Sequence, residues 1–242
     1  MDLKFLGAGS CFNTTLGNTS ACLPVGNSAF LLDCGESVFH QIQVGDLLNG
    51  FKNINIFVSH SHSDHCGSLS SLLFYCFYVL KVHPKVYAPK AVFQILDLQG
   101  TLDEIYEKNV LEACKKKVFQ TDMLSPSGLV NISVFPIKES HAEKLESFGF
   151  LFADSLGDCF YYSGDSKGFN TNILSLFRLN QVKKIYHDCS WLDYPDNIHL
   201  SYKKLCQIIT DPEERKRVVL MHFDKGFNFE QAKHDGWSFP TA

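Results

Sequence analysis

Short apolar runs alternate with longer amphipathic stretches along the chain, which has 242 residues. Runs rich in β-branched and aromatic residues predict strands at Leu3–Leu6, Ala29–Asp33, Ile54–Ser59, Lys85–Ala88, Ile132–Pro136, Gly149–Ala153, Cys159–Ser163, Lys184–His187 and Val218–His222. Apolar residues at helical spacing predict helices at Ser37–Val44, Leu69–Lys81, Ala91–Leu98, Leu102–Lys116, Thr171–Leu179, Tyr202–Thr210 and Glu230–His234. This alternation is typical of layered α/β architecture. Neither a repeat nor a Pro/Gly-rich linker divides the chain, so we expect a single domain over residues 1–242.

Polar clusters recur at the carboxyl ends of the predicted strands. They are Asp33-Cys34-Gly35, His60–His65, Gly164-Asp165-Ser166, Asp188 and His222. Loops that leave one edge of a sheet can converge, and such edges are where α/β proteins usually keep their sites. The pattern therefore predicts a functional site at one edge of the sheet layer.

One of these clusters is unusually rich in metal-binding side chains. Residues 59–66 read Ser-His-Ser-His-Ser-Asp-His-Cys and supply four strong ligands: His60, His62, Asp64 and His65. An extended backbone points His60 and His62 to the same side. Asp64 and His65 follow on the next turn, where they can face a second ion. Imidazole and carboxylate ligands suit Zn²⁺ and similar ions, so the run predicts a metal-activated hydrolase.

Three later residues can complete a site for two ions. His141 follows one predicted strand, His222 ends another, and Asp165 comes after Gly164, which permits a tight turn. A lone histidine at a strand end is more often only hydrogen-bonded than a ligand. The order of these three residues after the histidine-rich run favours the ligand interpretation.

Composition narrows the possible partners and compartments. Hydrophobic residues make up 45% of the chain, and 21 phenylalanines predict a bulky core. The formal net charge of −4 argues against a broad basic surface, so long nucleic acid is a less expected partner. The nine cysteines are odd in number, scattered, and never spaced as CxxC, which favours reduced thiols in a cytoplasmic protein. The start of the chain runs directly into a strand-like segment, so we expect no signal peptide. The longest apolar stretch, Leu72–Leu80, is too short to span a membrane.

Together with the opening Phe5-Leu6-Gly7-Ala8-Gly9-Ser10, these motifs resemble the metallo-β-lactamase-fold hydrolases over nearly the whole chain. Within that family the sequence is most similar to the RNase Z-like phosphodiesterase branch. The resemblance implies a four-layer αββα sandwich that holds two Zn²⁺ ions, although Mn²⁺ or Fe²⁺ would accept the same ligands. It implies one ion held by His60, His62, His141 and Asp165. It implies a second held by Asp64, His65, Asp165 and His222, with Asp165 and a hydroxide as bridges.

The same resemblance implies the chemistry of phosphodiester hydrolysis, in which hydroxide attacks phosphorus and a general acid protonates the leaving alkoxide. His199, in Asn197-Ile198-His199-Leu200-Ser201, matches the catalytic histidine of RNase Z-like enzymes. Asp188, in His187-Asp188-Cys189-Ser190, takes the place of the glutamate in the family's His-Glu-Ala-Thr-type segment and would orient and charge His199. By the same resemblance, Asp64 corresponds to the family's proton-handling carboxylate, in addition to its role as a metal ligand.

One interval departs from the RNase Z enzymes that process tRNA. From His141 to Asp165 is 165 − 141 = 24 residues, which leaves no room for their long tRNA-gripping arm. The chain is more similar to small-substrate members, including cyclic-nucleotide phosphodiesterases and the phage anti-Pycsar enzymes that degrade cyclic-nucleotide defence signals. We therefore expect a small nucleotide, best a 3′,5′-cyclic nucleotide, as substrate. An RNase Z-like ribonuclease or nuclease, a thioesterase or lactonase, and a non-catalytic nucleotide-binding module are the alternatives. Homodimers are common in this branch.

Several residues near the predicted site have two interpretations. Asp33 either accepts a hydrogen bond from a ligand imidazole or forms an ordinary turn before Gly35. His187 is expected to pack at a strand end. Residues 9–20, rich in Gly, Ser and Asn, either line the site or form a turn. The aromatic residues that either stack on a base or pack in the core are Phe12, Trp191, Tyr194 and Phe223.

Overall fold

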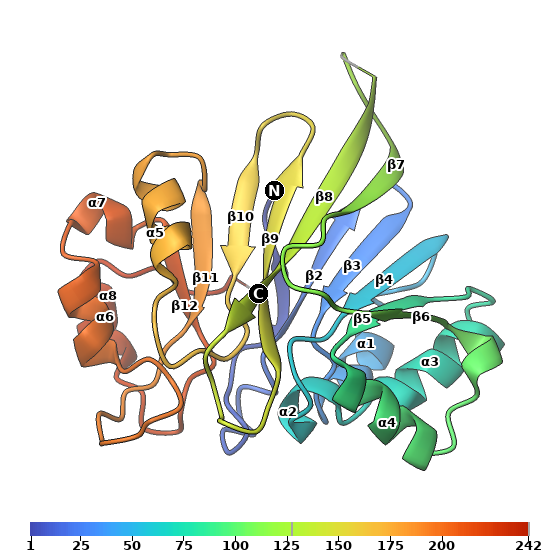
Figure 1. Ribbon diagram of the computed structural model, residues 1–242, viewed down its shortest axis with the longest axis horizontal. Coiled ribbons are helices and arrows are strands. Elements are labelled where there is room, and N and C mark those ends of the chain that lie inside the picture. Colours follow the sequence, from blue (N-terminus) through green and yellow to red (C-terminus); the bar gives the residue numbers. More distant parts are fainter. Residues whose placement is uncertain (127, 242) are drawn as a thin grey trace.

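Two six-stranded sheets face each other in the computed structural model, which describes residues 1–126 and 128–241 (Figure 1). The first sheet has the order β1 (Lys4–Gly7), β2 (Ser20–Val25), β3 (Ser28–Leu32), β4 (Asn53–Phe57), β5 (Lys85–Ala88) and β6 (Glu107–Val110). The second has the order β12 (Val218–Met221), β11 (Lys184–Asp188), β10 (Cys159–Tyr162), β9 (Ser147–Asp154), β8 (Gly128–Glu139) and β7 (Lys117–Ser125). Both sheets mix parallel and antiparallel pairs.

Helices cover the outer face of each sheet. The first sheet packs on α1 (Val38–Val44), α3 (Leu69–Tyr78) and α4 (Lys90–Leu98). The second packs on α5 (Thr171–Arg178), α6 (Tyr202–Ile208) and α8 (Phe229–His234), with α7 (Pro212–Arg215) beside them (Figure 1). The alternation in β3 explains the layering, because Ala29 and Leu31 pack towards the helices whereas Phe30 and Leu32 pack between the sheets. The layers therefore form the αββα sandwich that the sequence predicted.

The layer between the sheets is dominated by phenylalanine. Phe57 on β4 lies edge-on to Phe150 and Phe152 of β9, with ring centroids 5.5 and 5.6 Å apart. Phe30 makes a similar contact with Phe152 at 6.2 Å. Edge-to-face pairs stabilise by about 0.5–1.5 kcal/mol beyond their area burial. The bulky core expected from composition thus joins the two sheets and fixes how their edges face each other.

Most predicted elements are found with ends shifted by a few residues, but the predicted helix Leu102–Lys116 is wrong. That stretch holds a short 3₁₀ helix, η1 (Asp103–Ile105), and then β6, which pairs in parallel with β5 from Lys85 opposite Glu107. Its many charged residues favour a helix locally. Pairing with the free edge of the sheet outweighs that weak propensity.

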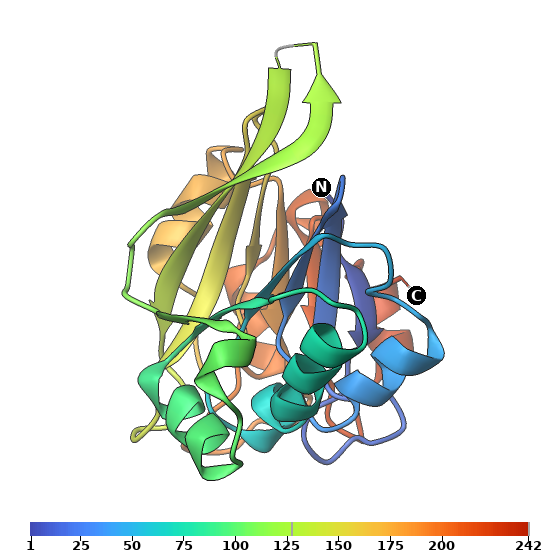
Figure 2. The ribbon, with the colours of Figure 1, turned by 90° about the vertical axis from the view of Figure 1, so that its right-hand side faces the viewer.

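Besides β6, two strands were missed from the sequence. One of them, β2, contains Pro24, a residue that disfavours central strands. The β1–β2 register runs only from Gly7 opposite Ser20 to Lys4 opposite Cys22, so Pro24 lies beyond the pairing with β1. The other, β7, forms a long hairpin with β8 that extends past the rest of the fold (Figure 2). Among the described residues, no helix has the length and apolarity needed to cross a membrane.

Candidate metal centre

The predicted ligands reach one place because of strand direction. Strands β10, β11 and β12 run parallel, and β8 is antiparallel to β9, which is antiparallel to β10. His141, Asp165, Asp188 and His222 therefore all leave the second sheet at the same edge. The segment His60–His65 follows β4 of the first sheet and meets them there. The predicted convergence of loops at the carboxyl ends of the strands is confirmed.

Unusual backbone conformations turn these loops towards the cluster. Gly164 has φ +58°, and an added Cβ would meet Phe148 O at 2.9 Å, so a side chain there is disfavoured twice. His222 has φ 61° directly after β12, a left-handed conformation that non-glycine residues adopt rarely. Gly35 lies so close to the ligand segment that a Cβ would stand 1.9 Å from Asp64 O. The backbone at these three turns thus allows the loops that carry the ligands to lie close to one another.

The first set of ligand atoms comes from His60, His62, His141 and Asp165. His62 Nδ1 lies 2.9 Å from His60 Nε2 and 3.3 Å from His141 Nε2. Asp165 Oδ2 lies 3.7 Å from the same His60 nitrogen and 3.6 Å from that of His141. Three imidazoles and one carboxylate oxygen therefore point at a common centre.

The second set comes from Asp64, His65, Asp165 and His222. His65 Nε2 lies 3.1 Å from Asp165 Oδ1 and 3.5 Å from Asp64 Oδ2. His222 Nε2 lies 3.3 Å from each of the same two oxygens. Because Oδ1 of Asp165 belongs to this set and Oδ2 to the first, its carboxylate joins the two centres.

These spacings fit divalent ions. A tetrahedral ion with ligand bonds of about 2.0–2.1 Å separates its ligand atoms by about 3.3 Å. The distances of 2.9 to 3.7 Å in the two sets surround that value. His65 Nε2 and Asp165 Oδ1 are also buried without a partner of hydrogen-bond geometry. The donor set, its spacing and these unpartnered atoms all match a pair of metal ions.

The protonation states of the residues in the first set also suit a metal ion. Burial lowers the pKa of His60 well below its usual value and also lowers those of His62 and His141, so their rings are neutral and can donate lone pairs. Burial alone would raise the pKa of Asp165, but His222 and His65 beside it hold that pKa well below its usual value. The linking carboxyl group is therefore ionised.

Asp33 supports the second set. Its carboxylate lies 3.0 Å from His65 Nδ1, the nitrogen that faces away from the cluster. Asp33 also accepts hydrogen bonds from Ser59 N at 2.7 Å and from the Tyr162 hydroxyl at 3.0 Å. A carboxylate behind a ligand imidazole fixes the ring and its tautomer. Of the two interpretations of Asp33, the geometry favours the one in which it holds a ligand.

His199 and Asp188 form a pair beside the cluster. His199 Nδ1 lies 2.7 Å from Asp188 Oδ2 and 3.9 Å from Asp165 Oδ2. Asp188 Oδ1 lies 3.5 Å from His222 Nδ1, so one buried carboxylate faces both histidines. Burial disfavours the charged imidazole, but Asp188 outweighs it and raises the pKa of His199. Asp188 therefore favours the protonated form of His199 at the edge of the cluster.

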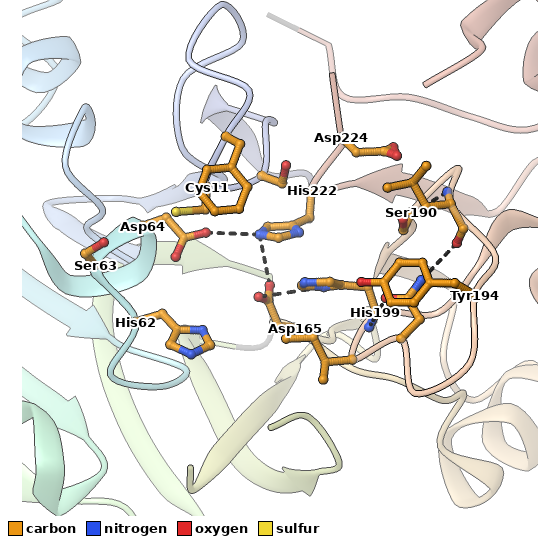
Figure 3. Close-up of a pocket in the computed structure, with 15 residues that line it drawn as sticks. Cys11, His62, Ser63, Asp64, Asp165, Ser190, Tyr194, His199, His222 and Asp224 are labelled. Carbon is orange, nitrogen blue, oxygen red and sulfur yellow. Dashed lines mark hydrogen bonds and ion pairs between the residues drawn. The ribbon is translucent and has the colours of Figure 1, made fainter. Parts of the chain in front are cut away.

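A cavity of about 460 Å³ opens over these residues. Its lining includes His62, Asp64, Asp165, His199 and His222, and Figure 3 shows Asp64, His222, Asp165 and His199 next to one another across the middle of the view. The rest of the wall is mainly apolar and includes Phe12, Leu192, Tyr194 and Ile198, with polar groups from Ser10, Ser190, Asn197 and Asp224. The Phe12 side chain is 87% exposed and that of Tyr194 50%. Such a cavity accepts a small molecule with an apolar part.

Of the other residues with two interpretations, some are structural and some line the cavity. Phe223 is buried in the core, and Trp191 stacks on Tyr202 with ring centroids 4.6 Å apart. His187 stacks on Phe169 at 4.6 Å, as predicted for packing at a strand end. In the loop 9–20, Ser10, Cys11 and Phe12 reach the cavity, whereas Thr19 donates its hydroxyl hydrogen to Gly9 O.

Two contributors were not predicted. Ser59 Oγ lies 3.0 Å from His60 Nδ1 and 3.3 Å from His65 Nδ1, so one hydroxyl contacts a ligand of each set. Asp224 lines the cavity and accepts a hydrogen bond from Trp191 N at 2.9 Å. The only sign in the sequence that Ser59 contributes to the site is its position directly before His60. Nothing in the sequence marked Asp224.

Comparisons with known proteins agree with this geometry. The fold matches the metallo-β-lactamase fold protein YhfI from Bacillus subtilis (TM-score 0.69, 13% identity, 98% of this chain and 94% of that one) and human tRNase Z, short form (TM-score 0.67, 22% identity, 100% and 96%). These neighbours show that the chain has the metallo-β-lactamase fold, and its His/Asp cluster has the ligand types and spacing of a metal site.

The family can be named more closely. The model of the anti-Pycsar protein Apyc1 family matches residues 1–240, and the chain belongs to that family. Similar curated proteins are the anti-Pycsar proteins Apyc1 of Paenibacillus xerothermodurans (24% identical, covering 93% of this chain and 88% of that protein) and of Bacillus phage BSP38 (25%, covering 94% and 90%). The RNase Z-like resemblance of the sequence is therefore confirmed and refined.

Proposed function

We propose that the protein is a phosphodiesterase that hydrolyses a small nucleotide diester, best a 3′,5′-cyclic nucleotide. The observation that carries the proposal is the contact of 2.7 Å between His199 and Asp188 beside the linking carboxylate of Asp165. An alkoxide is a poor leaving group, so breaking a phosphodiester bond benefits from an acid at this position. When bound, two divalent ions would supply a hydroxide near neutral pH and neutralise charge on the phosphate.

The residues of the chain divide the proton transfers between them. Burial alone would raise the pKa of Asp64, but the hydrogen bond with His222 outweighs burial, and the pKa is lowered. Asp64 is therefore a carboxylate that can accept a proton from the attacking water. The water oxygen bonds to phosphorus as the bond from phosphorus to the leaving oxygen breaks. His199 then gives its proton to the leaving oxygen, and Asp188 stabilises the charged ring before the transfer.

The cavity and the family support a cyclic nucleotide. A volume of about 460 Å³ lies within the range of about 300–1,000 Å³ typical of small-molecule sites. Phe12 and Tyr194 offer exposed rings on which a base can stack. The interval between His141 and Asp165 is filled by β9, β10 and their turns. Membership of the anti-Pycsar protein Apyc1 family agrees with the resemblance to enzymes that degrade cyclic-nucleotide defence signals.

A panel of substrate classes tests the proposal. Protein loaded with Zn²⁺ or Mn²⁺ is assayed on bis(p-nitrophenyl) phosphate, cyclic AMP and GMP, labelled single-stranded RNA, a thioester and a lactone. We expect turnover of bis(p-nitrophenyl) phosphate and of the cyclic nucleotides. Asp64→Ala should lose both activities, whereas His199→Ala should lose chiefly the cyclic-nucleotide activity. Cleavage of RNA alone would make the protein a ribonuclease, and turnover of only the thioester or lactone would make it a carboxyl-ester hydrolase. Stoichiometric nucleotide binding without turnover would indicate a binding module.

A further inference from the structure

Glu139 makes a set of contacts that neither the ligands nor the proposed acid explains. It ends β8, two residues before His141, and is half-buried. Its Oε1 accepts hydrogen bonds from the hydroxyl of Tyr161 and from Asn170 Nδ2, the latter at 3.2 Å. Its Oε2 lies 2.8 Å from Ser166 Oγ, which donates to it. A carboxylate bound by three separate segments holds those segments in one arrangement.

Ser166 connects this carboxylate to the proposed chemistry. It directly follows Asp165, whose two oxygens belong to the two ligand sets. Its backbone N–H donates to Asp188 Oδ2 at 3.1 Å, the same oxygen that faces His199. Its carbonyl accepts from Leu200 N at 2.8 Å, on the residue after His199. Moving Ser166 would therefore displace both Asp165 and the pair of Asp188 and His199.

Neighbouring backbone bonds bring the same segments together. Lys167 N donates to Ser140 O at 2.8 Å, which ties the residue before His141 to the Asp165 loop. Ser147, opposite Glu139 in the β8–β9 register, donates its hydroxyl hydrogen to Asp165 O at 3.3 Å. These bonds join the segment around His141 to the backbone of the loop that carries Asp165. Within this set, Glu139 and Ser166 supply the side-chain contact between them.

We propose that Glu139 is a positioning residue for this site. It acts through Ser166 to set the Asp165 carboxylate and the Asp188–His199 pair relative to His141. The inference rests on the proposed metal centre and proton donor but not on the identity of the nucleotide. Groups behind the ligands of a metal site commonly change metal affinity or activity by about 10–100-fold when they are removed.

The role requires an oxygen acceptor and the right length rather than a negative charge. Ser166 Oγ also lies 2.7 Å from Gly168 O, to which its hydrogen can turn. A glutamine at position 139 can accept from Tyr161 and Asn170 with its oxygen. Its amide N–H can then donate to Ser166 Oγ while Ser166 donates to Gly168. Glu139→Gln should therefore preserve the arrangement that Glu139→Ala removes.

The experiment compares Glu139→Ala and Glu139→Gln with Thr121→Val as a stability control. Thr121 donates a buried hydrogen bond to Val130 O at 2.7 Å in the β7–β8 hairpin, away from the cluster. Each protein is loaded with Co²⁺, and its visible absorption, its metal affinity, its kcat on bis(p-nitrophenyl) phosphate and the thermal unfolding of its metal-free form are measured. We expect Glu139→Ala to change the Co²⁺ spectrum and to lose about 10–100-fold in kcat or affinity. Glu139→Gln should restore both, and Thr121→Val should lower only the unfolding temperature.

Two results would overturn the inference. One is a Glu139→Ala protein with wild-type spectrum, affinity and kcat. The other is a Glu139→Gln protein as impaired as the alanine variant, which would assign the effect to charge. If Glu139→Ala does not fold, Ser166→Ala decides, because it removes the contact with Glu139 but keeps the bonds from Tyr161 and Asn170. A wild-type spectrum and kcat in Ser166→Ala would also reject the role. Since the Co²⁺ spectrum needs no substrate, failure of the proposed nucleotide activity leaves this test intact.

Discussion

Asp188 Oδ2 lies 2.7 Å from His199 Nδ1 at the end of the second sheet. The other oxygen of the same carboxylate lies 3.5 Å from Nδ1 of His222, a member of the second ligand set. Asp188 is fully buried, so both contacts occur away from water, where electrostatic interactions are strong. One side chain therefore faces a ligand ring and holds the proposed acid beside the same cluster.

Removal of His199 should slow hydrolysis according to the leaving group. For a cyclic nucleotide, whose leaving alkoxide needs a proton, His199→Ala should lower kcat by about 10²–10⁴-fold. For bis(p-nitrophenyl) phosphate the loss should be much smaller, because nitrophenolate leaves without protonation. Initial rates on both substrates check this, with the exposed His40→Ala on α1 as control. Equal losses on both substrates would instead mean that His199 supports the site structurally.

Asp188→Asn should move the pH profile of kcat/KM. His199 acts in its protonated form, and Asp188 raises its pKa despite burial. Without that carboxylate the pKa of His199 falls, so activity should be lost at lower pH on the alkaline side. Asp165 at 3.9 Å and the ring of His222 at 4.8 Å also face His199 and are unchanged. Metal content is measured in parallel because Asp188 also faces His222. An alkaline limb that stays in place or moves upward contradicts the assignment.

The sequence indicated the histidine-rich segment more directly than it indicated the residues and edge strands around it. The run from His60 to His65 is local, so its spacing alone indicates a metal site. His141, Asp165 and His222 could be chosen only through their order after that run and their positions at strand ends. Edge strand β6 was read as a helix because its pairing with β5 involves residues distant in sequence. Glu139 was missed for the same reason, since its partners at positions 161, 166 and 170 are brought to it only by the fold.

Substitutions in the two ligand sets should affect the ions separately or together. His62→Ala should weaken binding at the first set alone, and His222→Ala should weaken binding at the second. Asp165→Asn should weaken both, because each of its oxygens faces a different set. We expect losses of at least about 100-fold in affinity, since even groups behind the ligands contribute about 10–100-fold. Metal analysis after equilibrium dialysis measures this, and loss of one ion only from Asp165→Asn would argue against a shared carboxylate.

The exposed rings at the mouth of the cavity should contribute to substrate binding. Phe12→Ala and Tyr194→Ala should each raise KM for a cyclic nucleotide and leave kcat within a few-fold. Stacking of a base on an aromatic side chain is worth about 1–3 kcal/mol, which corresponds to about 5- to 150-fold in KM. Leu98→Ala, at a side chain 89% exposed on α4, is the control. An unchanged KM in both aromatic variants would place the base elsewhere in the cavity.

The most direct test of the central claim is turnover of 3′,5′-cyclic nucleotides by protein that carries two equivalents of metal per chain. Chromatography of the nucleotides follows conversion to the linear monophosphate over time. The account predicts many turnovers per chain, complete loss with a chelator, and recovery when Zn²⁺ or Mn²⁺ is restored. If metal-loaded, folded protein leaves every cyclic purine and pyrimidine nucleotide intact, the proposed activity is wrong.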